Sequence, residues 1–157
     1  MAKTYLSPSN TYSFEYPDDW KVEKEAGNTI VLFKKGGLFK KESANILRIT
    51  PFISDSIISP EAYKGLLNKR KKDHKDLEVV EKSDDFIMNF NILKYKKEST
   101  QDLGDTKLNF VSYYWELVVN NRIFTCWFTV NKDEVDLPKT REEMATAEKI
   151  LRSIKLL

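Results

Sequence analysis

Hydrophobic and polar residues alternate most regularly in two segments, 108–119 and 122–130, which are separated only by Asn120 and Asn121. Alternation with a period of two is typical of β-strands, and a two-residue turn joins antiparallel strands into a hairpin. With the turn at these asparagines, one face of the hairpin carries four mostly apolar cross-strand pairs: Val111–Val130, Tyr113–Phe128, Trp115–Cys126 and Leu117–Phe124. The position of the turn and the alternation therefore agree on one register.

The opposite face of this hairpin is half apolar. It would carry the cross-strand pairs Tyr114–Trp127, Val118–Ile123, Glu116–Thr125 and Ser112–Thr129. A mixed face of this kind is either covered by another layer of the fold or left open for binding. The sequence leaves both possibilities open.

Shorter segments predict further antiparallel strands in a meander-like order. Pro17 and the aspartates after it separate the first two strands, and Gly27 marks a hairpin turn. The expected strands, besides the hairpin, cover residues 11–15, 20–22, 29–33, 44–52, 77–80 and 86–95.

Two helices are expected. Ser59 followed by Pro60 is a typical helix start, and the short apolar stripe behind it predicts a helix on the surface. Thr140 and Glu143 have the spacing of a capping box, which predicts a second helix beginning at Thr140. Its apolar residues recur at helical spacing, so this helix should pack on the sheet: Met144, Ala147, Leu151 and Ile154.

The composition fits one domain covering residues 1–157. The chain has 41% hydrophobic and 32% charged residues, as folded globular proteins do, and no apolar stretch long enough to span a membrane. No secretory signal is visible at the start, so a cytoplasmic location is the default expectation. The single cysteine, Cys126, agrees with a reducing compartment.

No catalytic, metal or cofactor motif stands out. Cys126 falls on the apolar face of the hairpin, where an inert buried thiol is expected, and His74 is the only histidine. One histidine and one buried cysteine do not make a zinc site, and the acidic segment 131–136 lacks the pattern of a calcium loop. We therefore expect no cofactor, no metal and no enzymatic activity.

Charge argues against a nucleic-acid binder. The formal net charge is only +2, and the basic run KRKK at 69–72 has no aromatic residue within it for base stacking. The lysines of this run are expected to form a solvated helix face. The second basic segment, KKGGLFKK at 34–41, places Leu38 and Phe39 between four lysines. These two side chains either contact an acidic partner or a membrane surface, or fold back onto the core.

The order of elements, together with short motifs at both ends, resembles a known superfamily. The start carries Phe14, Tyr16, Pro17 and Trp20, and the end carries Ile150, Leu151, Ser153, Ile154 and Lys155. This combination resembles the PsbP-like superfamily, which includes photosystem PsbP proteins, Mog-type Ran-binding proteins and many bacterial proteins. The resemblance implies a bacterial α+β protein with an antiparallel β-sheet sandwiched between helices. It carries no catalytic residues and implies a binding or accessory role.

We therefore expect a non-enzymatic interaction module that binds a protein partner. The candidate partner-binding residues are Leu38, Phe39, Tyr114 and Trp127. The alternative is a small-molecule-binding protein or an enzyme without a recognisable motif, which would show a deep pocket with convergent polar groups. The oligomeric state and the identity of the partner are left open.

Overall fold

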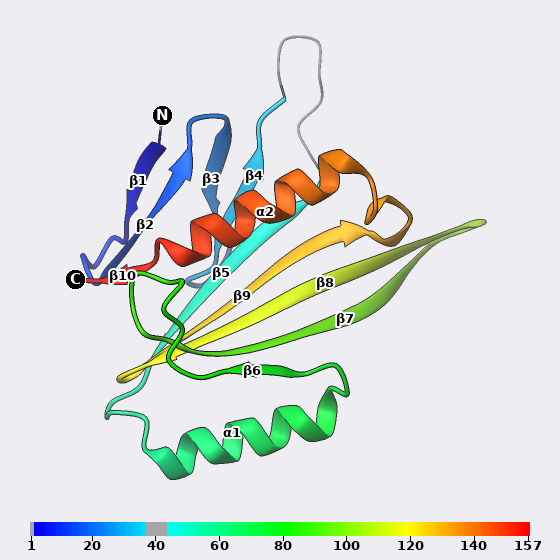
Figure 1. The fold of residues 1–157 in the computed structure, drawn as a ribbon. Helices are drawn as coiled ribbons and strands as arrows, with labels where there is room; N and C mark the ends of the chain where they lie inside the picture. The colour runs from blue at the N-terminus through cyan, green and yellow to red at the C-terminus, as the bar shows by residue number, and fades with distance from the viewer. Residues whose placement is uncertain (1, 37–43) are drawn as a thin grey trace.

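The structure, a computed structural model, describes residues 2–36 and 44–157 (Figure 1). Leu38 and Phe39 lie outside the described residues. In chain order the elements are β1 (Ala2–Leu6), β2 (Tyr12–Pro17), β3 (Trp20–Lys24), β4 (Ile30–Lys34), β5 (Ile46–Ile53), α1 (Pro60–Asp73), β6 (Glu78–Val80), β7 (Asn91–Leu103), β8 (Thr106–Val119), β9 (Arg122–Asn131), a 3-10 turn (Lys132–Glu134), α2 (Pro138–Arg152) and β10 (Lys155–Leu156).

Two antiparallel sheets form the framework. The larger sheet has the strand order β3-β4-β5-β9-β8-β7-β6, and the smaller sheet has the order β1-β2-β10. The long β7–β8 hairpin projects beyond the other strands of the large sheet (Figure 1). The α+β class and the antiparallel pairing expected from the sequence are therefore confirmed.

The predicted β8–β9 hairpin is present with the predicted register. Val119 pairs with Arg122 across the turn, and the pairing continues in step to Val111 and Val130. Asn120 has a φ of 52°, a left-handed conformation that asparagine tolerates better than most residues and that tight hairpin turns require.

The hydrophobic core lies between the large sheet, α2 and β2. We call the sheet face that α2 covers the inner face and the opposite one the outer face. Phe124 on the inner face packs edge-to-face on Tyr12 of β2, with ring centroids 5.2 Å apart. α2 contributes Ala147 and Leu151, both fully buried. The amphipathic pattern of α2 predicted this packing.

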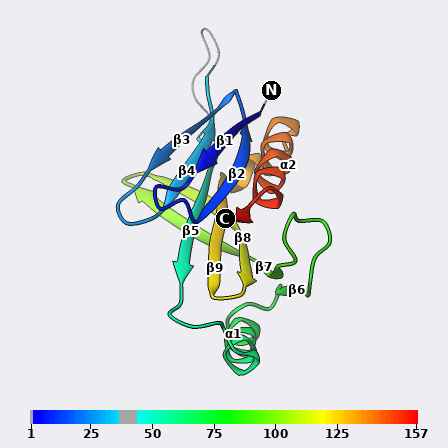
Figure 2. The same ribbon diagram turned by 90° about the vertical axis from the view of Figure 1, so that its left-hand side faces the viewer.

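Helix α1 is attached differently. Ser59 caps it as expected, since its hydroxyl accepts a hydrogen bond from Ala62 N at 3.1 Å. None of its residues is buried. Figures 1 and 2 show it on the far side of β6 from α2. It reaches the outer face through Arg70, described below, and the complete helical sandwich remains an expectation from the resemblance.

The start of α2 corrects one prediction. The helix begins at Pro138, and its N-cap is Leu137, which makes no side-chain capping bond. Proline at the first helical position needs no capping partner for its missing N–H, so the helix can start before Thr140. Thr140 and Glu143 are instead buried within the helix, and Glu143 accepts a hydrogen bond from Asn45 at 2.8 Å.

Other differences concern strand ends. The strand expected from residue 86 begins at Asn91, and Phe86 and Phe90 pack edge-to-face in the preceding loop with centroids 6.1 Å apart. Strands β1 and β10 and the extension of β7 to Leu103 were not predicted. Within the described residues, no helix is both long and apolar enough to cross a membrane.

Candidate functional site

A row of aromatic side chains crosses the outer face of the large sheet. The strand register aligns Tyr95 of β7, Tyr114 of β8 and Trp127 of β9. The Tyr95 and Tyr114 rings stack at 5.0 Å, and the Tyr114 and Trp127 rings stack at 5.7 Å. His74, which follows α1, stacks on Tyr95 at 4.0 Å. We call these four side chains the aromatic row.

The aromatic row is only partly covered. Tyr95 is buried, whereas Tyr114, Trp127 and His74 are partly exposed. Burial raises the pKa of Tyr114, as expected for a phenol held between two other rings. The predicted Tyr114–Trp127 pair therefore exists, and neither of its rings is fully covered by another element.

Positive charge accompanies the row. The Lys97 ammonium lies 5.0 Å from the centroid of the Tyr114 ring and 6.0 Å from that of Tyr95, which is within cation–π range. Lys97 forms no salt bridge within residues 2–36 and 44–157. Arg48 of β5 is aligned with Trp127, and its charge is balanced by Glu25 at 3.1 Å. Lys97 is thus an unpaired cation beside a partly exposed aromatic surface.

A buried ion pair fixes one end of the row. The carboxylate of Glu116, only 2% exposed, accepts hydrogen bonds from Arg70 Nε at 3.0 Å to each of its oxygens. Arg70 Nη2 lies 2.8 Å from Glu116 Oε1, and the Tyr95 hydroxyl donates to the same oxygen at 2.9 Å. The hydrogen bond with Glu116 raises the pKa of Arg70, while burial and then the Glu116 charge raise that of Tyr95.

This ion pair changes the interpretation of the KRKK run. Lys69, Lys71 and Lys72 are exposed, as expected for a solvated helix face. Arg70 instead turns toward the sheet and holds the end of α1 against β7 and β8. The guanidinium therefore has a structural role that its three neighbours do not share.

The residues that could carry other chemistry are not brought together. Cys126 is fully buried on the inner face, as predicted, and burial raises the pKa of its thiol. His74 belongs to the outer face, so the sheet separates the two side chains. No group of three or more His, Cys, Asp or Glu side chains suited to a metal ion occurs in the described part of the chain.

Several members of this surface were not anticipated from sequence. Tyr95, Lys97 and His74 join Tyr114 only because β7 pairs with β8 over its whole length. In the sequence, the signal for that pairing was Gly104. Its φ is 68° in the structure, a conformation that suits the tight turn between these strands. The outer face was therefore predicted in part, by its Tyr114–Trp127 pair.

The fold is shared with proteins of known structure. No family model matches this chain, and no match is found among curated proteins. A Bacteroides thetaiotaomicron VPI-5482 protein aligns over 99% of this chain with a TM-score of 0.68 and 19% identity. The aligned region is only 48% of that protein, so this chain spans about half its length.

Two further structures align over nearly their whole length. The cyanobacterial PsbP protein (CyanoP) of Synechocystis sp. PCC 6803 matches 99% of this chain and 92% of its own, with 12% identity and a TM-score of 0.53. The Saccharomyces cerevisiae Ran-binding protein Mog1p matches 99% and 95%, with 9% identity and a TM-score of 0.55. This chain has a PsbP/Mog1-like fold. The resemblance recognised in the sequence is thereby confirmed. At sequence identities this low, the similarity shows only that the fold is shared.

Proposed function

We propose that this chain is a non-enzymatic interaction module that binds a protein partner through the outer face of β7, β8 and β9. The observation that carries the proposal is the partly exposed aromatic row. Tyrosine and tryptophan are enriched among residues that dominate binding energy at protein interfaces, because they bury a large area with few rotatable bonds.

The shape and charge of the surface favour a protein over a small molecule at this place. The rings stack face to face across the strands, so their edges rather than a flat ring surface point outward. Such an arrangement offers a broad contact area on a sheet face. Lys97, which lies beside the Tyr114 ring, favours a partner with an acidic contact region.

The comparisons add a limited argument. Mog1p, which has the same fold, is named a Ran-binding protein. The fold is therefore compatible with protein recognition, although fold analogy does not identify the partner of this chain. Leu38 and Phe39 are a second candidate contact, which rests on the sequence alone.

The experiment first isolates a partner and then measures its binding directly. Tagged protein captures partners from lysate, mass spectrometry identifies them, and the purified partner is titrated against each variant. Trp127→Ala and Lys97→Glu should each weaken binding by about tenfold or more, as hot-spot truncations do. The melting temperature of each variant must stay close to that of the wild type.

The matched control is the triple variant Lys69→Glu, Lys71→Glu, Lys72→Glu, which leaves Arg70 and its ion pair intact. It should change binding little at physiological salt, because exposed charges away from the contact mainly affect the association rate. Leu38→Ala with Phe39→Ala tests the second candidate. Loss of binding only in the triple lysine variant would refute the proposed face.

A further inference from the structure

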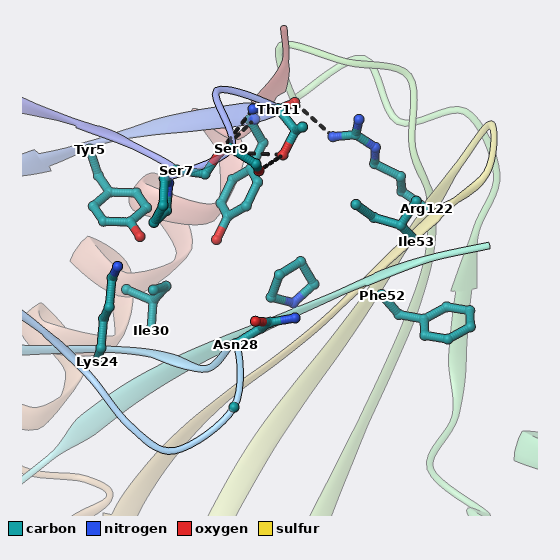
Figure 3. A pocket seen from close by; sticks show the side chains of 14 residues that line it. Tyr5, Ser7, Ser9, Thr11, Lys24, Asn28, Ile30, Phe52, Ile53 and Arg122 are labelled. Carbon is teal, nitrogen blue, oxygen red and sulfur yellow. Dashed lines mark hydrogen bonds between the residues drawn. The ribbon is translucent and has the colours of Figure 1, made fainter. Parts of the chain in front are cut away.

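A separate cavity of about 440 Å³ lies at one end of the molecule. Its walls are the β1–β2 turn, the β3–β4 turn, the last residues of β5 and Arg122 at the start of β9 (Figure 3). It is not part of the aromatic row, since the two share no residue. The volume falls within the range of pockets that hold small organic ligands, about 300–1,000 Å³.

The charged side chains that line the cavity are all positive. Lys24 and Arg122 line it, and none of the described residues in its walls is Asp or Glu. Neither cation forms a salt bridge within the described chain. The acidic neighbours of Lys24 are engaged elsewhere, because Glu23 pairs with Lys21 and Glu25 pairs with Arg48.

Two buried donors in the walls are not fully satisfied. The Nε of Arg122 and the hydroxyl of Tyr5 have no partner at hydrogen-bond distance and angle among the described residues, and the nearby Tyr12 phenol interacts with the Tyr5 hydroxyl. Figure 3 shows Lys24 and the Tyr5 hydroxyl reaching into the same space. A buried polar group without a partner destabilises the fold, and a ligand oxygen that accepts a hydrogen bond from it removes that cost. The Tyr5 hydroxyl and Arg122 Nε are shielded from solvent, so a small rotation of each side chain must accompany ligand binding.

The polar rim is held in place by hydrogen bonds. Ser7 Oγ accepts from Thr11 N at 2.9 Å and from Tyr12 N at 3.1 Å, which fixes the β1–β2 turn. Arg122 Nη1 donates to the Thr11 carbonyl at 2.7 Å, which ties β9 to the same turn. A rim fixed in this way loses little conformational entropy when a ligand binds.

Part of the remaining wall is apolar. Ile30, Pro51, Phe52 and Ile53 line the cavity, and Phe52 and Ile53 are more than half exposed. Exposed apolar side chains next to unpaired cations suit a ligand that has both an anionic group and an apolar body.

We propose that this cavity binds a small amphipathic organic anion. Its carboxylate or phosphate group contacts Lys24 and the Tyr5 hydroxyl, and its apolar body lies against Ile30 and Phe52. Arg122 adds positive charge and a further donor at the other end. The site is independent of the protein-binding face proposed above.

The test uses three probes with the same apolar chain: octanoate, octyl phosphate and octylammonium. Calorimetry measures their affinities for the complete chain, and NMR shift changes locate them. We expect saturable binding of at least one anion at millimolar concentration or below, with shifts centred on residues 5, 24, 28 and 30. Octylammonium should bind at least about tenfold more weakly. The comparison of octanoate with octyl phosphate identifies the preferred anionic group.

Two variants test the contacts without a foreseeable cost to folding. Tyr5→Phe keeps the ring and removes only the hydroxyl, and Lys24→Gln changes an exposed side chain. Each should weaken binding of the preferred anion about fivefold or more. Lys69→Gln on α1 is the matched control, because it removes the same charge from an exposed side chain outside the cavity and breaks no ion pair near Lys24, and it should leave affinity unchanged.

The proposal is overturned if neither anion saturates, if octylammonium binds as tightly as the anions, or if Tyr5→Phe and Lys24→Gln both bind like the wild type. It is also overturned if the shift changes centre on the aromatic row instead.

Discussion

The ion pair between Arg70 and Glu116 should contribute most to holding α1 against the sheet. None of the residues of α1 is buried, so the helix has little apolar contact to hold it in place. Glu116 is 2% exposed in its side chain, and Arg70 is 22% exposed. Substituting Arg70→Met keeps the aliphatic contact and the helix propensity but leaves a carboxylate buried without its cation.

The loss in free energy of unfolding expected for Arg70→Met follows from these exposed fractions. Breaking a buried ion pair from one side costs about 3–5 kcal/mol, because an unpaired charge is left behind. Water already reaches part of Arg70, so we expect the lower end, about 3 kcal/mol. Glu116→Gln should cost less, about 1–2 kcal/mol, because the partly exposed guanidinium retains access to water and Tyr95 retains an acceptor.

The double variant separates the interaction from the single side chains. Once Glu116→Gln has removed the carboxylate, loss of the arginine no longer leaves a buried charge without a partner. The double variant Arg70→Met with Glu116→Gln should therefore lose less free energy of unfolding than the two single variants lose together. We expect a coupling of at least about 1 kcal/mol. Urea unfolding followed by tryptophan fluorescence gives these free energies, provided that the denaturant slopes of the variants agree.

Hydrogen exchange adds a local measurement. If α1 opens in Arg70→Met, water reaches Glu116 and the global loss is limited, but the amides of residues 60–73 should then exchange faster. Lys71→Met, an exposed neighbour on the same helix, is the control and should change stability by no more than about 0.5 kcal/mol. A loss below about 1 kcal/mol in Arg70→Met, with unchanged exchange in α1, would refute the assignment of Arg70 as the anchor.

Three further predictions concern buried side chains. Trp20→Ala should destabilise the fold by about 3–5 kcal/mol in urea unfolding, since Trp20 is 2% exposed; a loss below about 1 kcal/mol would contradict its role in the core. Cys126 should react with a thiol reagent far more slowly in the native than in the denatured state, because it is fully buried and burial raises its thiol pKa; equal rates would contradict this. Burial raises the pKa of Tyr12 and Tyr95 above the ordinary value of 10.0. The folded state therefore favours the neutral phenols, and their contribution to the free energy of unfolding is complete below pH 10.0 and is lost as the pH rises further. Ultraviolet absorbance of tyrosinate should therefore show phenols that ionise only well above pH 10.0, and Tyr12→Phe and Tyr95→Phe should each remove one of them; full ionisation of all tyrosines near the ordinary pKa in the folded protein would count against this.

The sequence by itself determined the features that depend on neighbouring residues. The β8–β9 register follows from a two-residue turn and the period of a strand, both local properties, and it was predicted pair by pair. The Ser59 cap and the burial of Cys126 follow from similar local rules. The resemblance that identified the fold also rested on short motifs at the two ends of the chain.

Tertiary structure decided what lies beside these elements. Strand β1 is mostly exposed and shows little alternation, and its place is set by pairing with β2. Helical spacing places Arg70 on the same face as Leu66 and Leu67, but the sequence did not show that its partner is the buried Glu116 on a distant strand. The cavity likewise joins Tyr5, Lys24 and Arg122 from three separate strands. The physical reason is common to all three cases: local propensity fixes how a segment folds, whereas the charge and exposure of a surface depend on which segments the global packing brings together.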